Sequence, residues 1–268
     1  MCLIGTMLVA GIGWLDDHRA LPASLRLSVH IAAAFLAAVA LLGVPATLQQ
    51  TLLLGLAVFW IASLVNAWNF MDGIDGLATT QAVLAAVCIL AGGLLHAWFD
   101  AAWAAFALLF SGALLGFLPF NFPRARIFLG DVGSGALGFA IACLLLRAIA
   151  SGGMPWPLGL LPVSAFLVDA GLTLGNRIAH GSAWWRPHRE HLYQWLVRRG
   201  VPHSRVTLAY GAWTLATCML TLAIVDSAAG MSAGVVFAAL LSAIVLWNCI
   251  RKRLWMNARG SNAGSMRP

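Results

Sequence analysis

Residues 77–97 read LATTQAVLAAVCILAGGLLHA, an apolar run of 21 residues without a charged side chain. A helix that crosses the hydrocarbon core of a bilayer needs about 20 such residues in succession. Further runs of this kind follow one another along the whole chain. The sequence therefore predicts a protein made of membrane-spanning helices.

The composition excludes other classes of protein. Of the 268 residues, 61% are hydrophobic and 9% are charged, and the mean hydropathy is +0.88. A soluble domain carries about one quarter charged residues, so a soluble globular enzyme is excluded. The same values exclude a disordered chain, because such chains are poor in apolar residues.

Polar residues between the apolar runs divide the chain into spans. We expect an all-α, polytopic bundle of about eight full spans, preceded by a partial span over residues 3–15. Residues 1–250 are expected to form one membrane-embedded domain, followed by a basic, disordered tail over residues 251–268. The full spans are predicted at residues 24–43, 49–66, 77–97, 101–119, 133–150, 156–176, 205–225 and 231–250.

The basic residues indicate which side of the membrane each loop occupies. Alternating the loops, and counting the tail and the adjoining span ends at Arg26 and Arg205, places 15 of the 16 Arg and Lys residues on one side and only Arg147 on the other. By the positive-inside rule, the basic side is cytoplasmic. The tail cluster at residues 251–253 predicts contact with anionic lipid and not with nucleic acid. The cytoplasmic loops are residues 15–23, 67–76, 120–132 and 177–204.

The first candidate site follows a predicted span, where residues 66–76 read NAWNFMDGIDG. Asn69, Asp72 and Asp75 are spaced three apart, which brings neighbours to one face of a helical turn. Two carboxylates and an amide oxygen suit Mg²⁺, with Mn²⁺ as the alternative cation. The competing interpretation is a helix end capped by glycine, with its acids in a turn.

The second candidate site is the loop at residues 121–135, NFPRARIFLGDVGSG. Asp131 stands among glycines, which let the backbone approach a phosphate, and the following helix N-terminus favours an anion. This loop, which begins at Asn121, could instead be a simple turn and helix cap. Together with Asp72 and Asp75, Asp131 favours a shared Mg²⁺–diphosphate site.

An adjacent acid pair, Asp16 and Asp17, lies in the first cytoplasmic loop. Neighbouring residues do not point the same way on a helix, so we expect the two carboxylates to have different partners. One is expected to face the site, and the other to cap a helix or pair with a cation.

The longest cytoplasmic loop contains residues 186–196, RPHREHLYQWL. Arginine suits recognition of phosphate, and histidine can donate a hydrogen bond to it, so Arg186, His188, Arg189 and His191 are candidates. Leu192, Trp195 and Leu196 would share one face of a short helix. The competing interpretation is therefore an ordinary interfacial helix with basic residues.

Asp169 lies alone inside a predicted span. A carboxylate at the centre of a spanning helix costs roughly 2.5–3.5 kcal/mol on the insertion scale, which makes it a functional candidate by default. A packing role is the alternative, with Asp169 hydrogen-bonded to Thr173 or Asn176 or paired with an arginine.

Several strings resemble the polyprenyl-phosphate N-acetylhexosamine-1-phosphate transferases (glycosyltransferase family 4), which include the phospho-MurNAc-pentapeptide translocase. The string at residues 188–193, HREHLY, further resembles the O-antigen-initiating branch. The family strings are Asp16-Asp17 followed by Leu21-Pro22 and Arg26-Leu27, then NAWNFMDGIDGLA at residues 66–78 and IFLGDVGS at residues 127–134.

The resemblance implies Mg²⁺-dependent transfer of a sugar 1-phosphate from a UDP-sugar to undecaprenyl phosphate, with release of UMP. This reaction would start O-antigen or other envelope polysaccharide synthesis at the cytoplasmic face of a bacterial inner membrane. A homodimer is left open.

The resemblance also implies roles for individual residues. Asp131 would bind the metal, Asp72 and Asp75 would serve metal and diphosphate, and Asp16 and Asp17 would attend the lipid phosphate. Binding of the sugar nucleotide would involve Asn69, Asn121, Asp169, His188, Arg189 and His191. Because members of the family have two or three spans before the acid pair, the sequence resembles a member that lacks them.

Two other classes predict different patterns. CDP-alcohol phosphatidyltransferases would show Asp-Gly-x-x-Ala-Arg and a downstream Asp-x-x-x-Asp, but residues 75–79 read DGLAT. A transporter would show paired broken helices and polar groups at mid-bilayer, and only Asp169 comes close.

Overall fold

The structure is a computed structural model that describes residues 1–182, 188–227 and 229–264. Over these residues the chain forms helices and loops without a strand, which confirms the predicted all-α fold. The elements are α1 (Cys2–His18), α2 (Ala23–Leu42), α3 (Leu48–Met71), α4 (Leu77–Leu95), α5 (Ala101–Asn121), α6 (Gly130–Ala150), the 3₁₀ helix η1 (Trp156–Val163), α7 (Ser164–Ala179), α8 (Leu192–Arg198), α9 (His203–Ile224) and α10 (Ala229–Gly264).

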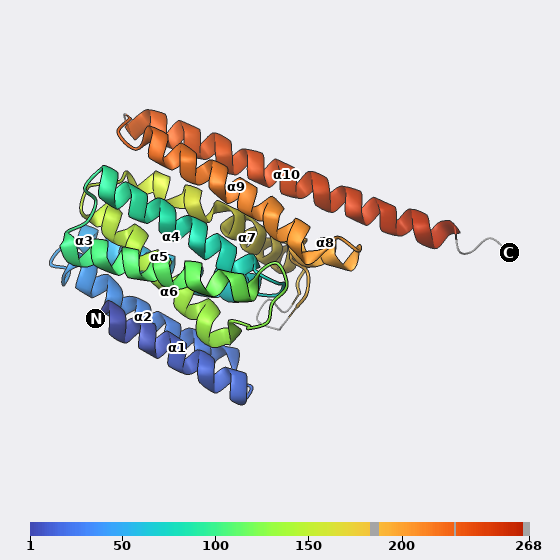
Figure 1. Cartoon of the computed structure of the whole chain (residues 1–268), viewed down its shortest axis with the longest axis horizontal. Helices are drawn as coiled ribbons and strands as arrows, with labels where there is room; N and C mark the ends of the chain where they lie inside the picture. Colours follow the sequence, from blue (N-terminus) through green and yellow to red (C-terminus); the bar gives the residue numbers. More distant parts are fainter. Residues whose placement is uncertain (183–187, 228, 265–268) are drawn as a thin grey trace.

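Within the described part of the chain, eight helical segments are long and apolar enough to cross a membrane. They are α2 to α6, η1 joined to α7, α9, and α10 over Gly230–Leu254, as the sequence predicted. The 17-residue α1 is the expected partial span. Figure 1 shows α1 and α2 along one edge of the bundle and α9 and α10 along the opposite edge.

The central helix α6 packs closely against α1 and α3 because glycines lie at the crossings. A β-carbon on Gly138 would lie 2.4 Å from the carbonyl oxygen of Leu64 in α3. A β-carbon on Gly13 would lie 2.4 Å from the carbonyl oxygen of Asp131 in α6. Small residues at such crossings let membrane helices approach each other. The second crossing brings the start of α6 against the end of α1, where the acid pair lies.

Polar contacts distinguish the two ends of the bundle. At one end Arg147 Nη2 lies 3.0 Å from Asp100 Oδ2, which joins the end of α6 to the start of α5. At the other end, residues from the predicted cytoplasmic loops contact one another, as described below. The loops that the sequence assigned to one side therefore share one end, and Arg147 lies at the opposite end.

Two helices extend beyond their predicted boundaries. α3 continues to Met71, so Asn69 lies on its last turn instead of in a loop. α10 continues to Gly264, whereas the sequence predicted a disordered tail from residue 251. No proline interrupts residues 231–264, and Arg and Lys are good helix formers. The predicted short helix with Leu192, Trp195 and Leu196 is α8.

Candidate active site

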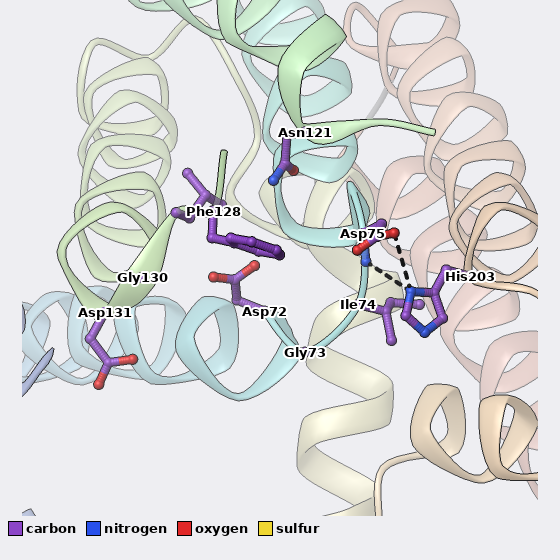
Figure 2. A pocket seen from close by; sticks show the side chains of 10 residues that line it. Asp72, Gly73, Ile74, Asp75, Asn121, Phe128, Gly130, Asp131 and His203 are labelled. Carbon is purple, nitrogen blue, oxygen red and sulfur yellow. Dashed lines mark hydrogen bonds and ion pairs between the residues drawn. The ribbon is translucent and has the colours of Figure 1, made fainter. Parts of the chain in front are cut away.

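A cavity of about 370 Å³ lies at the end of the bundle where the predicted loops meet. Its walls come from the turn after α3, the loop before α6 and the first residue of α9. Figure 2 shows acidic side chains on two of these walls. The polar residues that line the cavity are Asp72, Asp75, Asn121, Asp131 and His203. The structure thus brings together four residues that the sequence selected from two separate loops.

Asp131 lies in the first turn of α6 and is held by α3. The side-chain amide of Asn69 donates to Asp131 Oδ1 at 2.8 Å and to Ser134 Oγ at 3.3 Å. Because Asn69 uses its nitrogen for both contacts, its carbonyl oxygen remains available. The hydrogen bonds fix the Asp131 carboxylate relative to the end of α3.

Arg26 provides a positive charge that the sequence analysis quoted but did not assign to the site. Its Nη1 lies 2.6 Å from Asp16 Oδ2 and 3.2 Å from Asp131 Oδ2. The sequence feature that could have indicated this role is the position of Arg26, ten residues after Asp16 and near the start of α2. Arg26 therefore links the acid pair to the candidate metal ligand.

The two members of the acid pair have different partners, as expected. Asp16 accepts from the backbone N–H of Leu21 at 2.7 Å in addition to its contact with Arg26. Asp17 accepts from the backbone N–H groups of Asp131 and Val132 at 3.1 and 3.4 Å. Asp17 thus caps the start of α6, where free N–H groups favour a negative charge.

Gly130 makes the Asp17 contact possible. Its φ is +62°, and a β-carbon there would lie 2.6 Å from Asp17 Oδ2. An L-residue would therefore be strained in the backbone and would also displace the carboxylate. The structure therefore requires glycine at position 130, independently of the phosphate binding predicted for this loop.

Asp72 caps the C-terminus of α3 through its backbone N–H, which donates to the carbonyl oxygen of Asn69, while its carboxylate has no hydrogen-bond or ion-pair partner among the described residues. Burial, together with the negative charges of Asp131 and Asp17, raises the pKa of the Asp72 carboxyl to about 7. A cation next to Asp72 would lower that pKa by favouring the ionised form. The cavity therefore presents a carboxylate that lacks a counter-charge.

The oxygen donors suit a hard divalent cation. Mg²⁺ keeps several waters and is usually held by one or two carboxylates together with substrate phosphates. Asp72 and Asp131 line one cavity, and the free amide oxygen of Asn69 lies beside Asp131. Within the described residues, no three His, Cys, Asp or Glu side chains cluster closely enough to hold a metal on their own. The site thus fits a cation that is shared with a phosphate substrate.

Asn121 lines the cavity, but its side chain already has protein partners. Its Oδ1 accepts from Thr79 Oγ1 at 2.7 Å, and its Nδ2 donates to the carbonyl oxygen of Ile127 at 2.9 Å. These bonds fix the loop between α5 and α6 against α4. In the structure Asn121 therefore shapes the wall that carries Asp131.

Asp75 is held by α9. Its Oδ2 lies 3.5 Å from His203 Nδ1, and its carbonyl oxygen accepts from Thr207 Oγ1 at 2.9 Å. His203 was not predicted as a site residue. Little in the sequence indicated its role, since His203 is a single histidine that follows Pro202 just before a predicted span.

Asp169 lies outside the cavity and is almost completely buried. It accepts hydrogen bonds from three further elements: α8, α9 and α10. The donors are the backbone N–H of Leu192 at 2.9 Å, the hydroxyl of Tyr210 at 2.7 Å and the indole N–H of Trp247 at 3.0 Å. Thr173 also donates to it at 3.3 Å, so the contacts agree with the packing alternative.

The segment before α8 packs on the end of α3 and does not line the cavity. The rings of His191 and His188 lie 6.1 and 6.4 Å from that of Phe70, and Tyr193 donates to the Phe70 carbonyl oxygen at 3.0 Å. His191 is buried, with Nδ1 3.8 Å from Asp169 Oδ1. Arg189 is exposed.

His188, in contrast, is half-buried. Burial, with the nearby His191 and Arg177, lowers the pKa of the His188 imidazole. Arg186, predicted with this group, lies outside the described residues. The structure thus places His188 beside the end of α3, where Asp72 begins the cavity wall.

The chain matches the family described as "Glycosyl transferase family 4" over residues 1–149. It is 31% identical over 241 residues to the "Decaprenyl-phosphate N-acetylglucosaminephosphotransferase" of Mycobacterium leprae, covering 79% of this chain and 61% of the relative. It is 29% identical over 223 residues to the "Probable undecaprenyl-phosphate N-acetylglucosaminyl 1-phosphate transferase" of Bacillus subtilis, covering 76% and 60%.

A third relative is a phospho-MurNAc-pentapeptide transferase, a kind of enzyme that the resemblance above includes beside the O-antigen-initiating branch. The "Phospho-N-acetylmuramoyl-pentapeptide-transferase" of a Synechococcus is 37% identical over 175 residues, covering 58% of this chain and 49% of the relative. The chain spans about three fifths of the length of the first relatives it matches. These similarities support neither a CDP-alcohol phosphatidyltransferase nor a transporter.

Proposed function

We propose, from the premise that this chain belongs to glycosyl transferase family 4, that it is an enzyme transferring a sugar 1-phosphate from a UDP-sugar to a polyprenyl phosphate. The observation that carries the proposal is the cavity shared by Asp72 and Asp131 at one end of a membrane bundle. A lipid phosphate at the bilayer surface and a soluble nucleotide sugar can both reach such a position.

The proposed chemistry depends mainly on charge and position. A phosphate monoester has a second pKa near 6, so the lipid phosphate is largely dianionic at neutral pH and needs no general base. Its oxygen attacks the phosphorus that bears the sugar, while the bond from that phosphorus to UMP breaks. In-line positioning of the two substrates supplies much of the rate.

Asp72 and Asp131, with the amide oxygen of Asn69, would hold Mg²⁺. Bound Mg²⁺ would neutralise the diphosphate and the charge that develops on the leaving UMP. Asn69 orients Asp131, and Asp17 holds the start of α6 in place. Arg26, between Asp16 and Asp131, carries the positive charge closest to the acid pair and would face the lipid phosphate.

Three finer features belong to the proposal. The names of two relatives support an N-acetylhexosamine as the sugar, and undecaprenyl phosphate as the acceptor is supported by one of them. The concentration of Arg residues at the site's end of the bundle supports a cytoplasmic site in a bacterial inner membrane. The product would start O-antigen or another envelope polysaccharide, as the HREHLY string suggests.

UMP release tests the proposed reaction. Membranes containing the chain would receive undecaprenyl phosphate and a panel of UDP-N-acetylhexosamines, with Mg²⁺ or with EDTA. We expect Mg²⁺-dependent release with at least one sugar, and loss of that release in Asp131→Asn. Asp100→Asn is the matched control, because Asp100 lies at the opposite end of the bundle. Release that persists in EDTA or in Asp131→Asn would contradict the proposal.

A further inference from the structure

The ionisable side chains that line the cavity are acidic, with one exception among the described residues. Asp72, Asp75 and Asp131 face a space that the proposed function fills with a diphosphate and a lipid phosphate. Of the described residues that line the cavity, His203 is the one whose side chain can carry a positive charge. An anion that enters needs hydrogen-bond donors besides a metal ion, and His203 lines the cavity next to Asp75, with which its Nδ1 is in contact (Figure 2).

Asp75 determines which nitrogen of His203 faces away from the protein. Nδ1 lies 3.5 Å from both Oδ2 and the backbone nitrogen of Asp75. Nε2 has no hydrogen-bond partner among the described residues, and the side chain is 41% exposed. The available nitrogen is therefore Nε2.

The contact with the backbone N–H of Asp75 favours a proton on Nε2, because the neutral ring that accepts through Nδ1 carries its proton on Nε2. When Nδ1 instead donates to the Asp75 carboxylate, Nε2 is a donor only in the charged imidazolium, since the neutral ring then has its single proton on Nδ1. The exposed edge of His203 is therefore a donor when Nδ1 accepts from the backbone N–H or when the ring is charged.

The unit that holds His203 is rigid. His203 opens the 22-residue helix α9, and Thr207 one turn later donates to the carbonyl oxygen of Asp75 at 2.9 Å. The side chain and the backbone of Asp75 are thus both bound to the first turns of α9. A donor on a fixed helix costs little conformational entropy when it binds a ligand.

We propose that His203, oriented by Asp75, binds a phosphate oxygen of the nucleotide-sugar substrate through Nε2–H. The inference rests on the proposed function and deepens it. It also assigns Asp75 a different role from that of Asp72 and Asp131, since Asp75 would position His203 and would not hold the metal.

Two substitutions at position 203 separate the two nitrogens. The amide nitrogen of asparagine can replace Nδ1, and that of glutamine can replace Nε2. We expect His203→Asn to raise the KM for the UDP-sugar on the order of tenfold, the usual effect of losing a hydrogen bond to a charged group. His203→Gln should recover part of this loss. His180→Asn is the matched control, because His180 is exposed at the end of α7.

Mg²⁺ titration distinguishes Asp75 from the metal ligands. We expect His203→Asn and Asp75→Asn to leave the Mg²⁺ concentration for half-maximal activity unchanged, whereas Asp131→Asn abolishes activity. The double variant should be no worse than the poorer single variant, because the two residues act as one unit. A raised Mg²⁺ requirement in Asp75→Asn would overturn the inference by making Asp75 a metal ligand.

Binding provides a readout that does not need turnover. UDP-N-acetylglucosamine would be titrated calorimetrically, with Mg²⁺, into wild type and variants of matched thermal stability. Binding that is equal in wild type, His203→Asn and His203→Gln would refute the role of His203 and leave the proposed function intact. A wild type that neither binds nor turns over any UDP-sugar would refute the proposed function itself.

Discussion

Asp131 contacts residues from three other helices of the site, α1, α2 and α3. It touches Asn69 and Arg26 through its side chain and Asp17 through its backbone. α1, α2, α3 and α6 therefore meet at one residue, Asp131. Its position depends on these neighbours, so changes in them should alter metal binding before they alter stability.

Asn69→Ala tests this dependence. The variant loses the 2.8 Å hydrogen bond to Asp131, together with the amide oxygen proposed for Mg²⁺, but keeps the Asp131 carboxylate. Residues that orient a metal ligand typically contribute 10–100-fold to affinity or activity. We expect the Mg²⁺ midpoint of activity to rise by about tenfold, with the thermal unfolding midpoint nearly unchanged. An unchanged Mg²⁺ midpoint would show that Asn69 does not orient Asp131.

The pH dependence of cation binding should reflect the protonation of the Asp72 carboxyl. Because the pKa of Asp72 is raised to about 7, the cation must displace a proton at lower pH. We therefore expect the affinity for Mg²⁺ to rise between about pH 6 and pH 8 and to level off above. In Asp72→Asn this part of the pH dependence should vanish. A wild-type affinity that stays constant over the range would contradict the assignment.

At the scale of elements, the turns at the helix ends determine the site more than the spans do. Bilayer thickness and the distribution of arginines were enough to predict the spans and their common end. They also predicted that Asp72, Asp75 and Asp131 would meet. Arg26 and His203 could not be predicted in this way, because each is a single basic residue whose role depends on a partner distant in the sequence.

The C-terminal boundary of α3 and the hydrogen-bond partners of Asp169 could not be predicted from the sequence pattern either. The hydropathy falls before the helix ends, so α3 appeared to stop near residue 66 and not at Met71. Asp169 appeared to be a functional acid because its cost in a membrane is high. Its hydrogen-bond donors from α8, α9 and α10 become visible only in the packed bundle.

Gly130→Ala should damage the turn that begins α6. The positive φ and the contact with Asp17 together are expected to cost about 1–3 kcal/mol. Gly112→Ala is the matched control, since Gly112 lies within α5 and a β-carbon added there would have no neighbouring atom within 4 Å. We expect a lower thermal unfolding midpoint and weaker Mg²⁺ dependence only in Gly130→Ala. Equal behaviour of the two variants would contradict the role given to the turn.

Asp169→Asn should separate a packing role from a binding role. The substitution keeps the shape but removes the charge that accepts from Leu192, Tyr210 and Trp247. Hydrogen bonds to charged groups contribute about 1.5–3 kcal/mol, so we expect a lower unfolding midpoint in detergent. The folded fraction should keep its KM for the UDP-sugar. A raised KM with unchanged stability would instead support direct substrate binding.

At the scale of the whole molecule, the candidate site and the described polar residues that support it lie at one end of the bundle. The cavity, the acid pair and the segment before α8 share one end, and Asp100 with Arg147 lies at the other. Apolar side chains cover much of the outer surface of α2, α5 and α10, as lipid contact requires. The soluble substrate should therefore reach the site from one side only.

Vesicles of known orientation test this sidedness. With the UDP-sugar added outside, inverted membrane vesicles should release UMP, and right-side-out vesicles should release it only after permeabilisation. The reason is that the positive-inside rule predicts the arginine-rich loops on the cytoplasmic side. Equal release by both kinds of sealed vesicle would contradict the assigned topology.

If the chain transfers a sugar together with its phosphate, as we propose, the phosphorus atom next to the sugar must move to the lipid. A UDP-N-acetylhexosamine labelled with ³²P at the phosphate next to the sugar would be given to the purified protein with undecaprenyl phosphate and Mg²⁺. We predict that the label enters the lipid fraction and that unlabelled UMP appears in equal amount. Label that stays in water-soluble UDP while the sugar moves to the lipid would contradict the account.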